Sequence, residues 1–258
     1  MSLSPDDIQS DNDVIIHLFG EPEIYTSHGV LRESEMKSPK IASLITYLVL
    51  HPHITLSPTS LAEHICDETE ADTENVAKNI RGLVYRFRQM FALISKYQLI
   101  ESTPNGYRLN PKLNIMTDIQ KFDEYREAVG KTASVINKVE LLKQAMELYK
   151  GNILTSAAGE HWLMGTSSRY YINYIGVVNE LLKTLADAND YYDITQYASK
   201  SLEVEPGNMK AYYWHILAMY KQGATEMAIS QLKVAQHNLI SEEYDELIQL
   251  LKERKIEM

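Results

Sequence analysis

The chain has 258 residues, 45% of them apolar, and its 25 basic and 35 acidic side chains give a formal net charge of −10. This length is enough for two domains of ordinary size. The single cysteine, Cys66, excludes an internal disulfide. The start of the chain has no secretory signal, and no apolar run approaches the ~20 residues that span a bilayer, so we expect a cytoplasmic protein with no membrane partner.

The charge is distributed unevenly along the chain. Residues 1–72 carry three basic and thirteen acidic side chains, net −10, and residues 116–258 carry fifteen and twenty, net −5. Residues 73–115 carry seven basic and two acidic side chains, net +5. An acidic protein is a poor candidate for binding nucleic acid, because affinity for DNA comes largely from neutralising phosphates. The positive middle segment is the exception.

Short strands are predicted near the start of the chain. Residues 1–13 are polar and acidic without an apolar period, and they predict a disordered leader or a linker. Residues 14–19 and 23–27 are runs of β-forming side chains separated by a Gly-Glu-Pro turn, and His28-Gly29 is a second turn signal. We therefore expect two or three short antiparallel strands.

Three helices and a hairpin should follow. Ser38-Pro39 and Ser57-Pro58 are start signals for two helices, because serine can cap a helix and proline suits its first position. Thr73 begins a third helix with apolar residues at spacings of three and four. The turn Pro104-Asn105-Gly106 then separates two short β segments. This order predicts a winged helix over residues 14–117.

Residues 118–258 predict helices only. The segments with helical spacing of apolar residues are 122–129, 135–149, 162–188, 191–204, 209–222, 225–237 and 242–254. Two of them begin at Tyr191 and Thr225, and this offset of 34 matches the tetratricopeptide period. We expect a mainly α protein with a small β component: an N-terminal winged helix-turn-helix followed by an all-α, tetratricopeptide-like helical repeat domain.

The third helix carries the candidate DNA-binding side chains. Its apolar residues fix one face on the core, while long cations and a phenol lie on or beside the other face, where a helix can enter the major groove. These side chains are Lys78, Arg81, Tyr85, Arg86 and Arg88. An exposed basic helix can also be a merely solvated face. Lys37 and Lys40, at the start of the first helix, and the following hairpin favour DNA, because they can meet phosphates and the minor groove.

The ordered motifs resemble the OmpR-type winged helix and, beyond it, the Streptomyces antibiotic regulatory protein family with its bacterial transcriptional activator domain. The motifs that carry the resemblance are Leu56-Ser-Pro-Thr-Ser-Leu61, Asn79-Ile-Arg followed by Arg86-Phe-Arg88, Asn105-Gly-Tyr-Arg-Leu109, Asp118-Ile-Gln-Lys-Phe122 and Leu148-Tyr-Lys-Gly-Asn-Ile-Leu154. Together they cover roughly Val14 to Leu239.

The resemblance implies a transcription activator that inserts its third helix into double-stranded DNA, often as a homodimer on direct repeats, with RNA polymerase recruited nearby. Four residues fall where the family contacts bases and phosphates: Lys78, Asn79, Arg81 and Tyr85. Arg86 falls on a phosphate-contact position, and Arg88 equally fits an internal salt bridge. The sequence departs from the family in having Gly82 and Leu83 at often polar positions, Thr103 and Asn105 on the wing where arginine is common, and Cys66 for tryptophan.

No motif predicts an enzyme, a cofactor or a metal site. Cys66 and His64 are two residues apart on a predicted helix, so their side chains do not face each other. His51 and His53 lack the further ligands that complete a metal shell. Neither Gly20-Glu-Pro nor Pro104-Asn-Gly has the spacing of a phosphate-binding loop.

Two alternatives stay open. The chain can be a protein-interaction scaffold or a signalling output module, in which a degenerate winged helix is a packing platform and residues 1–13 are a linker to a receiver or sensor domain of a two-component system. The many tyrosines of the helical half fit packing between helices, or, for a subset, a groove that binds a ligand or peptide.

Overall fold

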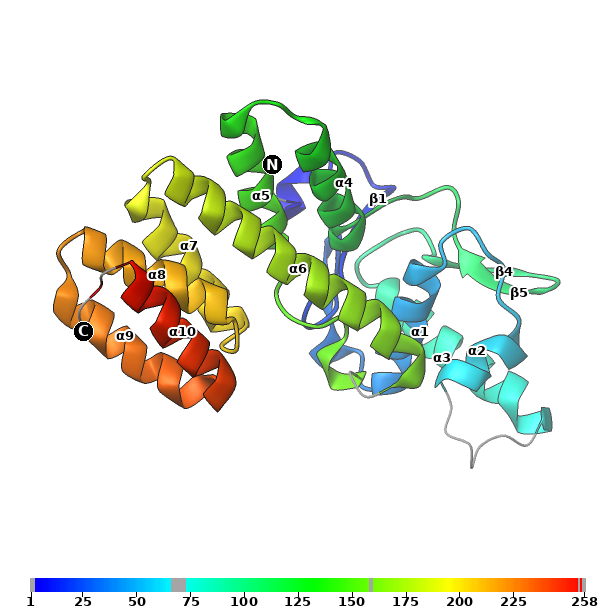
Figure 1. Ribbon diagram of the computed structural model, residues 1–258. Coiled ribbons are helices and arrows are strands. Elements are labelled where there is room, and N and C mark those ends of the chain that lie inside the picture. Colours follow the sequence, from blue (N-terminus) through cyan, green and yellow to red (C-terminus); the bar gives the residue numbers. More distant parts are fainter. Residues whose placement is uncertain (1–2, 66–72, 158–159, 255, 257–258) are drawn as a thin grey trace. The chain divides into compact units, whose positions relative to one another are not determined.

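The computed structural model describes residues 3–65, 73–157, 160–254 and 256. Two compact units make up the chain: an N-terminal unit, Met1–Phe122 with Asn152–Arg169, and a helical unit, Asp123–Gly151 with Tyr170–Met258. The prediction for Cys66 lies outside the described residues. A small β component at the N-terminus precedes a purely helical part, which confirms the predicted fold class (Figure 1).

The larger sheet of the N-terminal unit has four strands in the order β3-β2-β1-β6. These strands are β1 (Asp13–His17), β2 (Glu23–Thr26), β3 (Gly29–Arg32) and β6 (Asn114–Thr117). Strand β2 runs antiparallel to both neighbours, whereas β6 runs parallel to β1 and places Ile115 opposite Val14. The sequence analysis missed β6, because four residues are too few for a period and the pairing partner lies about 100 residues away.

The helices of this unit are α1 (Pro39–Leu50), α2 (Pro58–Ile65) and α3 (Thr73–Phe91). Every residue of α1 from Ile41 to Val49 is buried, since the helix packs against α2, α3, β5 and the short turn η4 (Thr155–Ala157). The Ser57 hydroxyl accepts a hydrogen bond from the Ser60 amide at 3.1 Å, as its start signal predicted. Ser38 is the N-cap residue of α1 and Pro39 its first residue, as predicted, but the Ser38 side chain makes no capping hydrogen bond.

The β4–β5 hairpin (Ile100–Thr103 and Gly106–Leu109) is anchored to the segment before α2. Leu56 and Tyr107 exchange both backbone hydrogen bonds, at 2.8 and 2.9 Å. Gly106 has φ +142°, and a Cβ at this position would lie 2.0 Å from the Leu56 carbonyl oxygen. The hairpin turn therefore requires glycine, as its sequence suggested.

Residues 3–12 are ordered, so the prediction of a disordered leader is wrong for this stretch. Pro5–Asp7 forms a short 3-10 turn, and Leu3 is buried. Asp13 accepts hydrogen bonds from the Ser10 amide at 2.8 Å and from the Asn114 side chain at 2.9 Å. The prediction was wrong because it relied on the low content of apolar residues. In the structure the acidic side chains of this stretch accept hydrogen bonds from donors of the folded unit.

A buried carboxylate joins the end of β1 to the start of α4 (Asp118–Lys131). Asp118 accepts hydrogen bonds from the amides of Leu18 at 2.8 Å and Phe19 at 2.9 Å, and from the amide of Ile119 at 2.8 Å. The Phe19 and Phe122 rings meet edge to face with their centroids 5.5 Å apart. Burial raises the pKa of the Asp118 carboxyl from 3.8 to about 7, although the three amides favour the charged form.

The segment 152–154 returns to the same strand end. The Gly20 amide donates to the Asn152 carbonyl at 3.0 Å, the Leu154 amide donates to the Leu18 carbonyl at 3.3 Å, and the Ile153 side chain is fully buried. Two of the motifs that carry the family resemblance, Asp118–Phe122 and Leu148–Leu154, therefore converge on residues 18–20.

The remaining helices follow the predicted segments closely. They are α5 (Val135–Leu148), α6 (His161–Asp187), α7 (Tyr191–Val204), α8 (Met209–Lys221), α9 (Thr225–Asn238) and α10 (Ser241–Glu253). In the helical unit α8 packs against α7, α9 and α10, and eight of its residues are buried. Helices α7 and α9 begin at the two positions that the 34-residue offset indicated. Among the described residues, no helix combines the length and apolar composition needed to cross a membrane.

We expect Gly106→Ala to lower the free energy of unfolding by more than about 2 kcal/mol, because the new methyl group would overlap a backbone oxygen. Gly165→Ala is the matched control. It lies in α6 with nothing within 4 Å of its Cβ, so it should stabilise the unit by up to about 1 kcal/mol. Urea denaturation measures both; losses of equal size would refute the steric argument.

Stability should also depend on the protonation of Asp118. Its folded pKa of about 7 exceeds the unfolded value of 3.8, so its contribution is full below pH 4 and is lost as the pH rises to 7. The wild type should lose on the order of 4 kcal/mol relative to Asp118→Asn over this range. Asp245→Asn, an exposed control, should parallel the wild type. Parallel curves for wild type and Asp118→Asn in urea titrations would contradict this.

Candidate nucleic-acid interface

Helix α3 has one buried and one exposed face. Its buried side chains are Ile80, Leu83, Val84, Phe87 and Phe91, in agreement with the predicted core stripe. Its exposed residues are Lys78, Asn79, Arg81, Gly82, Tyr85, Arg86 and Gln89. The side chains of residues 73–76, which include the predicted start residue Thr73, lie outside the described part. The sequence analysis did not name Gln89, although its position four residues after Tyr85 was a signal for it.

Three cations of the positive segment are engaged within the protein. Lys96 pairs with Asp11 of the leader, and the Arg108 guanidinium donates to the Glu101 carboxylate at 2.8 Å. Arg88 donates to the Ile100 carbonyl at 2.8 Å and to the Ser102 hydroxyl at 2.9 Å, both on β4. Arg88 therefore orients the hairpin against α3, which corrects the alternative of an internal salt bridge.

Lys78, Arg81 and Arg86 differ from those three cations. All three are exposed, and none makes a hydrogen bond or ion pair with another residue among those whose side chains the structure describes. They lie within nine residues on one helix, and Tyr85, with 64% of its surface exposed, lies next to Arg86. This part of α3 therefore presents positive charge that no described side chain neutralises.

Gly82 stands inside the exposed face of α3, and nothing lies within 4 Å of a Cβ built on it. Its backbone needs no positive φ. A glycine in a helix interior costs about 1 kcal/mol relative to alanine. The packing of the unit gives no reason for it.

The two hairpin candidates have different roles. The Thr103 hydroxyl donates to the Gly106 carbonyl at 3.2 Å and accepts from the Asn105 amide at 3.3 Å, so it stabilises the turn. The Asn105 side chain is exposed at the tip of the hairpin. Only Asn105 is therefore oriented for contact outside the protein without a change in the turn.

Lys37 and Lys40 lie apart from these residues. Lys37, exposed and with φ +55°, borders a surface hollow before α1. Two carboxylates, Glu21 and Glu33, line the same hollow, and none of its lining residues comes from α3 or the hairpin. Lys40 is half-buried. The acidic neighbours make this a weaker phosphate site than the sequence suggested.

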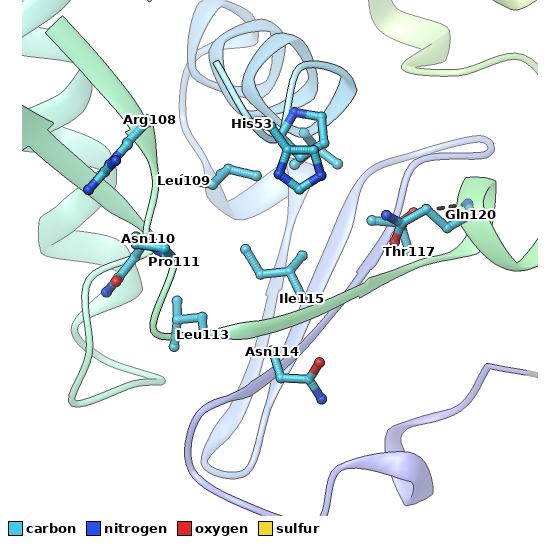
Figure 2. Close-up of a pocket in the computed structure, with 12 residues that line it drawn as sticks. His53, Arg108, Leu109, Asn110, Pro111, Leu113, Asn114, Ile115, Thr117 and Gln120 are labelled. Atoms are coloured by element: carbon cyan, nitrogen blue, oxygen red, sulfur yellow. Dashed lines mark hydrogen bonds between the residues drawn. The ribbon is translucent and has the colours of Figure 1, made fainter. Parts of the chain in front are cut away.

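A cavity of about 430 Å³ lies where the end of α1 meets β5 and β6 (Figure 2). Its apolar lining includes Val49, Leu109, Leu113 and Ile115. Four of its polar side chains are bound within the protein: Arg108 by Glu101, Asn110 by Gln98, Asn114 by Asp13 and Thr117 by Gln120. These groups therefore do not point to a ligand. Among the described residues no cluster of three or more acidic, histidine or cysteine side chains could hold a metal ion.

Comparison with known proteins identifies the C-terminal part. Residues 117–251, more than half of the chain, match the bacterial transcriptional activator domain family. The structure is similar to that of Mycobacterium tuberculosis EmbR in complex with a low-affinity phosphopeptide, with a TM-score of 0.63 and 12% identity over 93% of this chain. The chain spans 65% of the EmbR chain. No curated protein matches the sequence.

Arg88 is bound within the protein and Arg81 has no described partner, so replacing them should affect the stability of the protein differently. Arg88→Met should lower the free energy of unfolding by about 1–2 kcal/mol, because the Ile100 carbonyl loses a charged donor. Arg81→Met, which removes an exposed side chain without a described partner, should change it by less than about 0.5 kcal/mol. Chemical denaturation of the two variants decides the point; equal stabilities would mean that Arg88 does not hold the hairpin.

Proposed function

The chain belongs to the bacterial transcriptional activator domain family, as its resemblance to the Streptomyces antibiotic regulatory proteins predicted, and we propose that it binds double-stranded DNA to regulate transcription. In this proposal α1–α3 and the β4–β5 hairpin act as a winged helix, with α3 in the major groove. The regulator is an activator.

The three exposed cations of α3, which have no partner among the described side chains, carry this proposal. The chain as a whole has a net charge of −10 and should repel DNA. Lys78, Arg81 and Arg86 nevertheless share one exposed face of α3, where they form a local positive surface. Cations of this kind gain affinity by releasing counterions from DNA. Asn79, on the same face, has the amide that pairs with the major-groove edge of adenine. Asn105 on the hairpin tip is placed for the adjacent minor groove, and Lys37, Lys40 and Thr103 are secondary candidates.

The helical unit supplies protein contacts in the same proposal: a homodimer, RNA polymerase or a signalling input. Several of its large apolar side chains are exposed, and such side chains frequently mark interaction surfaces. They are Ile136 at 82%, Tyr192 at 74%, Ile172 at 66% and Met227 at 60%.

A protein-interaction scaffold is the second candidate. It is favoured by the hairpin, whose Thr103 is engaged in the turn and whose tip has no cation, and by the acidic hollow around Lys37. In that case the N-terminal unit is a packing platform and the helical unit alone binds partners.

Reversing two charges separates the candidates. The double variant Arg81→Glu with Arg86→Glu should weaken binding to the best site selected from a random DNA library at least about a hundredfold, because attraction to phosphate becomes repulsion. Its circular dichroism should stay unchanged, because both side chains are exposed. Binding by the wild type should also weaken steeply with added salt.

Lys183→Glu with Lys221→Glu is the matched control, since it changes the net charge equally on exposed positions of the helical unit. It should retain the affinity of the wild type. Full affinity of the Arg81/Arg86 variant would refute α3 as the DNA-binding element, and no enrichment from the library would favour the scaffold.

A further inference from the structure

Gly82 is surrounded by the candidate DNA contacts of α3. On a helix, the neighbours of a residue on the surface are those three and four positions away. For Gly82 these are Lys78, Asn79, Tyr85 and Arg86, and all four are exposed. The exposed face of α3 therefore has a gap, one side chain wide, at the centre of this ring.

The fold does not account for this gap. A Cβ at Gly82 would meet nothing within 4 Å, and the backbone is ordinary helix. Elsewhere in the unit a glycine has a clear structural cause: Gly106 combines a positive φ with a backbone oxygen 2.0 Å from the position of a Cβ. Where packing and conformation give no reason for a glycine, close approach of a ligand to the backbone is the remaining physical reason.

The chemistry of the ring indicates which group approaches. The long side chains of Lys78 and Arg86 can reach phosphates at the edges of a groove about 12 Å wide, so the gap between them faces the base edges. The floor of the gap is backbone with Cα hydrogens, and Tyr85, three positions after Gly82, is exposed on the same face. The apolar group that base edges present in the major groove is the 5-methyl group of thymine.

We infer that Gly82 is a specificity-determining residue, which admits the 5-methyl group of a thymine into the gap between Asn79 and Tyr85. This inference rests on the proposed DNA binding and adds a base preference to it. Asn79, one turn before the gap, is placed to pair with an adenine of the same or the adjacent base pair. The expected operator thus has an A·T base pair at the position that faces Gly82.

The test compares thymine with deoxyuridine, which lacks the methyl group. The full chain selects its best site from a random library, each thymine of that site is replaced in turn, and Kd is measured by fluorescence anisotropy. For the wild type, replacing the thymine that faces Gly82 should weaken binding about fourfold, the effect of one buried methyl group. Gly82→Ala should bind the thymine site at least about tenfold more weakly and should no longer distinguish thymine from deoxyuridine at that position.

Gly176→Ala is the control, because this glycine of α6 is also exposed and has nothing within 4 Å of its Cβ. Both alanine variants should melt a few degrees higher than the wild type, since alanine is the better helix former, so unfolding cannot explain a loss of binding by Gly82→Ala. Gly176→Ala should bind as the wild type does.

The outcomes separate this inference from the proposed function. Tight binding to a selected site with equal affinities for the wild type and Gly82→Ala would overturn the role of the gap and leave DNA binding intact. Weaker binding by Gly82→Ala with no response of the wild type to any deoxyuridine would overturn thymine as the occupant. A library that yields no enriched site would overturn the proposed function, and the inference with it.

Discussion

The hydrogen bonds of the buried Asp118 carboxylate close the loop of chain on which the N-terminal unit depends. Leu18 and Asp118 are 100 residues apart in sequence, and α1, α2, α3 and the β4–β5 hairpin all lie between them. Burying a carboxylate is costly, and here three backbone amides at 2.8–2.9 Å offset part of that cost. Closing so long a loop costs conformational entropy, which the packing of α1 against α2, α3 and β5 inside it helps to offset.

The same strand end receives a second segment, and this gives the family motifs a physical meaning. Residues 152–154 hydrogen-bond with Leu18 and Gly20, while Phe122 packs on Phe19. The aspartate of one motif and the isoleucine of the other are therefore not surface signatures of function. They are the contacts by which segments that precede and follow α5 join the N-terminal sheet.

Six of the seven basic side chains of the positive segment separate into two groups once the fold is known. Arg88, Lys96 and Arg108 stabilise the unit by binding the hairpin, the leader and Glu101. Lys78, Arg81 and Arg86 have no such role among the described side chains. A total charge of −10 is thus compatible with a locally positive helix, because the field at a surface depends on nearby charges that lack partners and distant charges are screened by salt.

The sequence by itself determined what depends on neighbours along the chain. Spacings of three and four residues gave the buried face of α3 and the helices that begin at Tyr191 and Thr225, and local turn chemistry gave Gly106 its place in the hairpin. Only the tertiary structure decided what depends on distant partners. Strand β6 forms because it pairs with β1. Residues 3–12 are ordered, with Asp13 bound to Asn114 and Asp11 to Lys96, and the hydrogen bonds of Arg88 hold it to β4. A periodic pattern indicates which face of a helix or strand is apolar, but not which groups from elsewhere in the chain contact it. Those contacts distinguish cations that stabilise the fold from cations that are available to bind a partner.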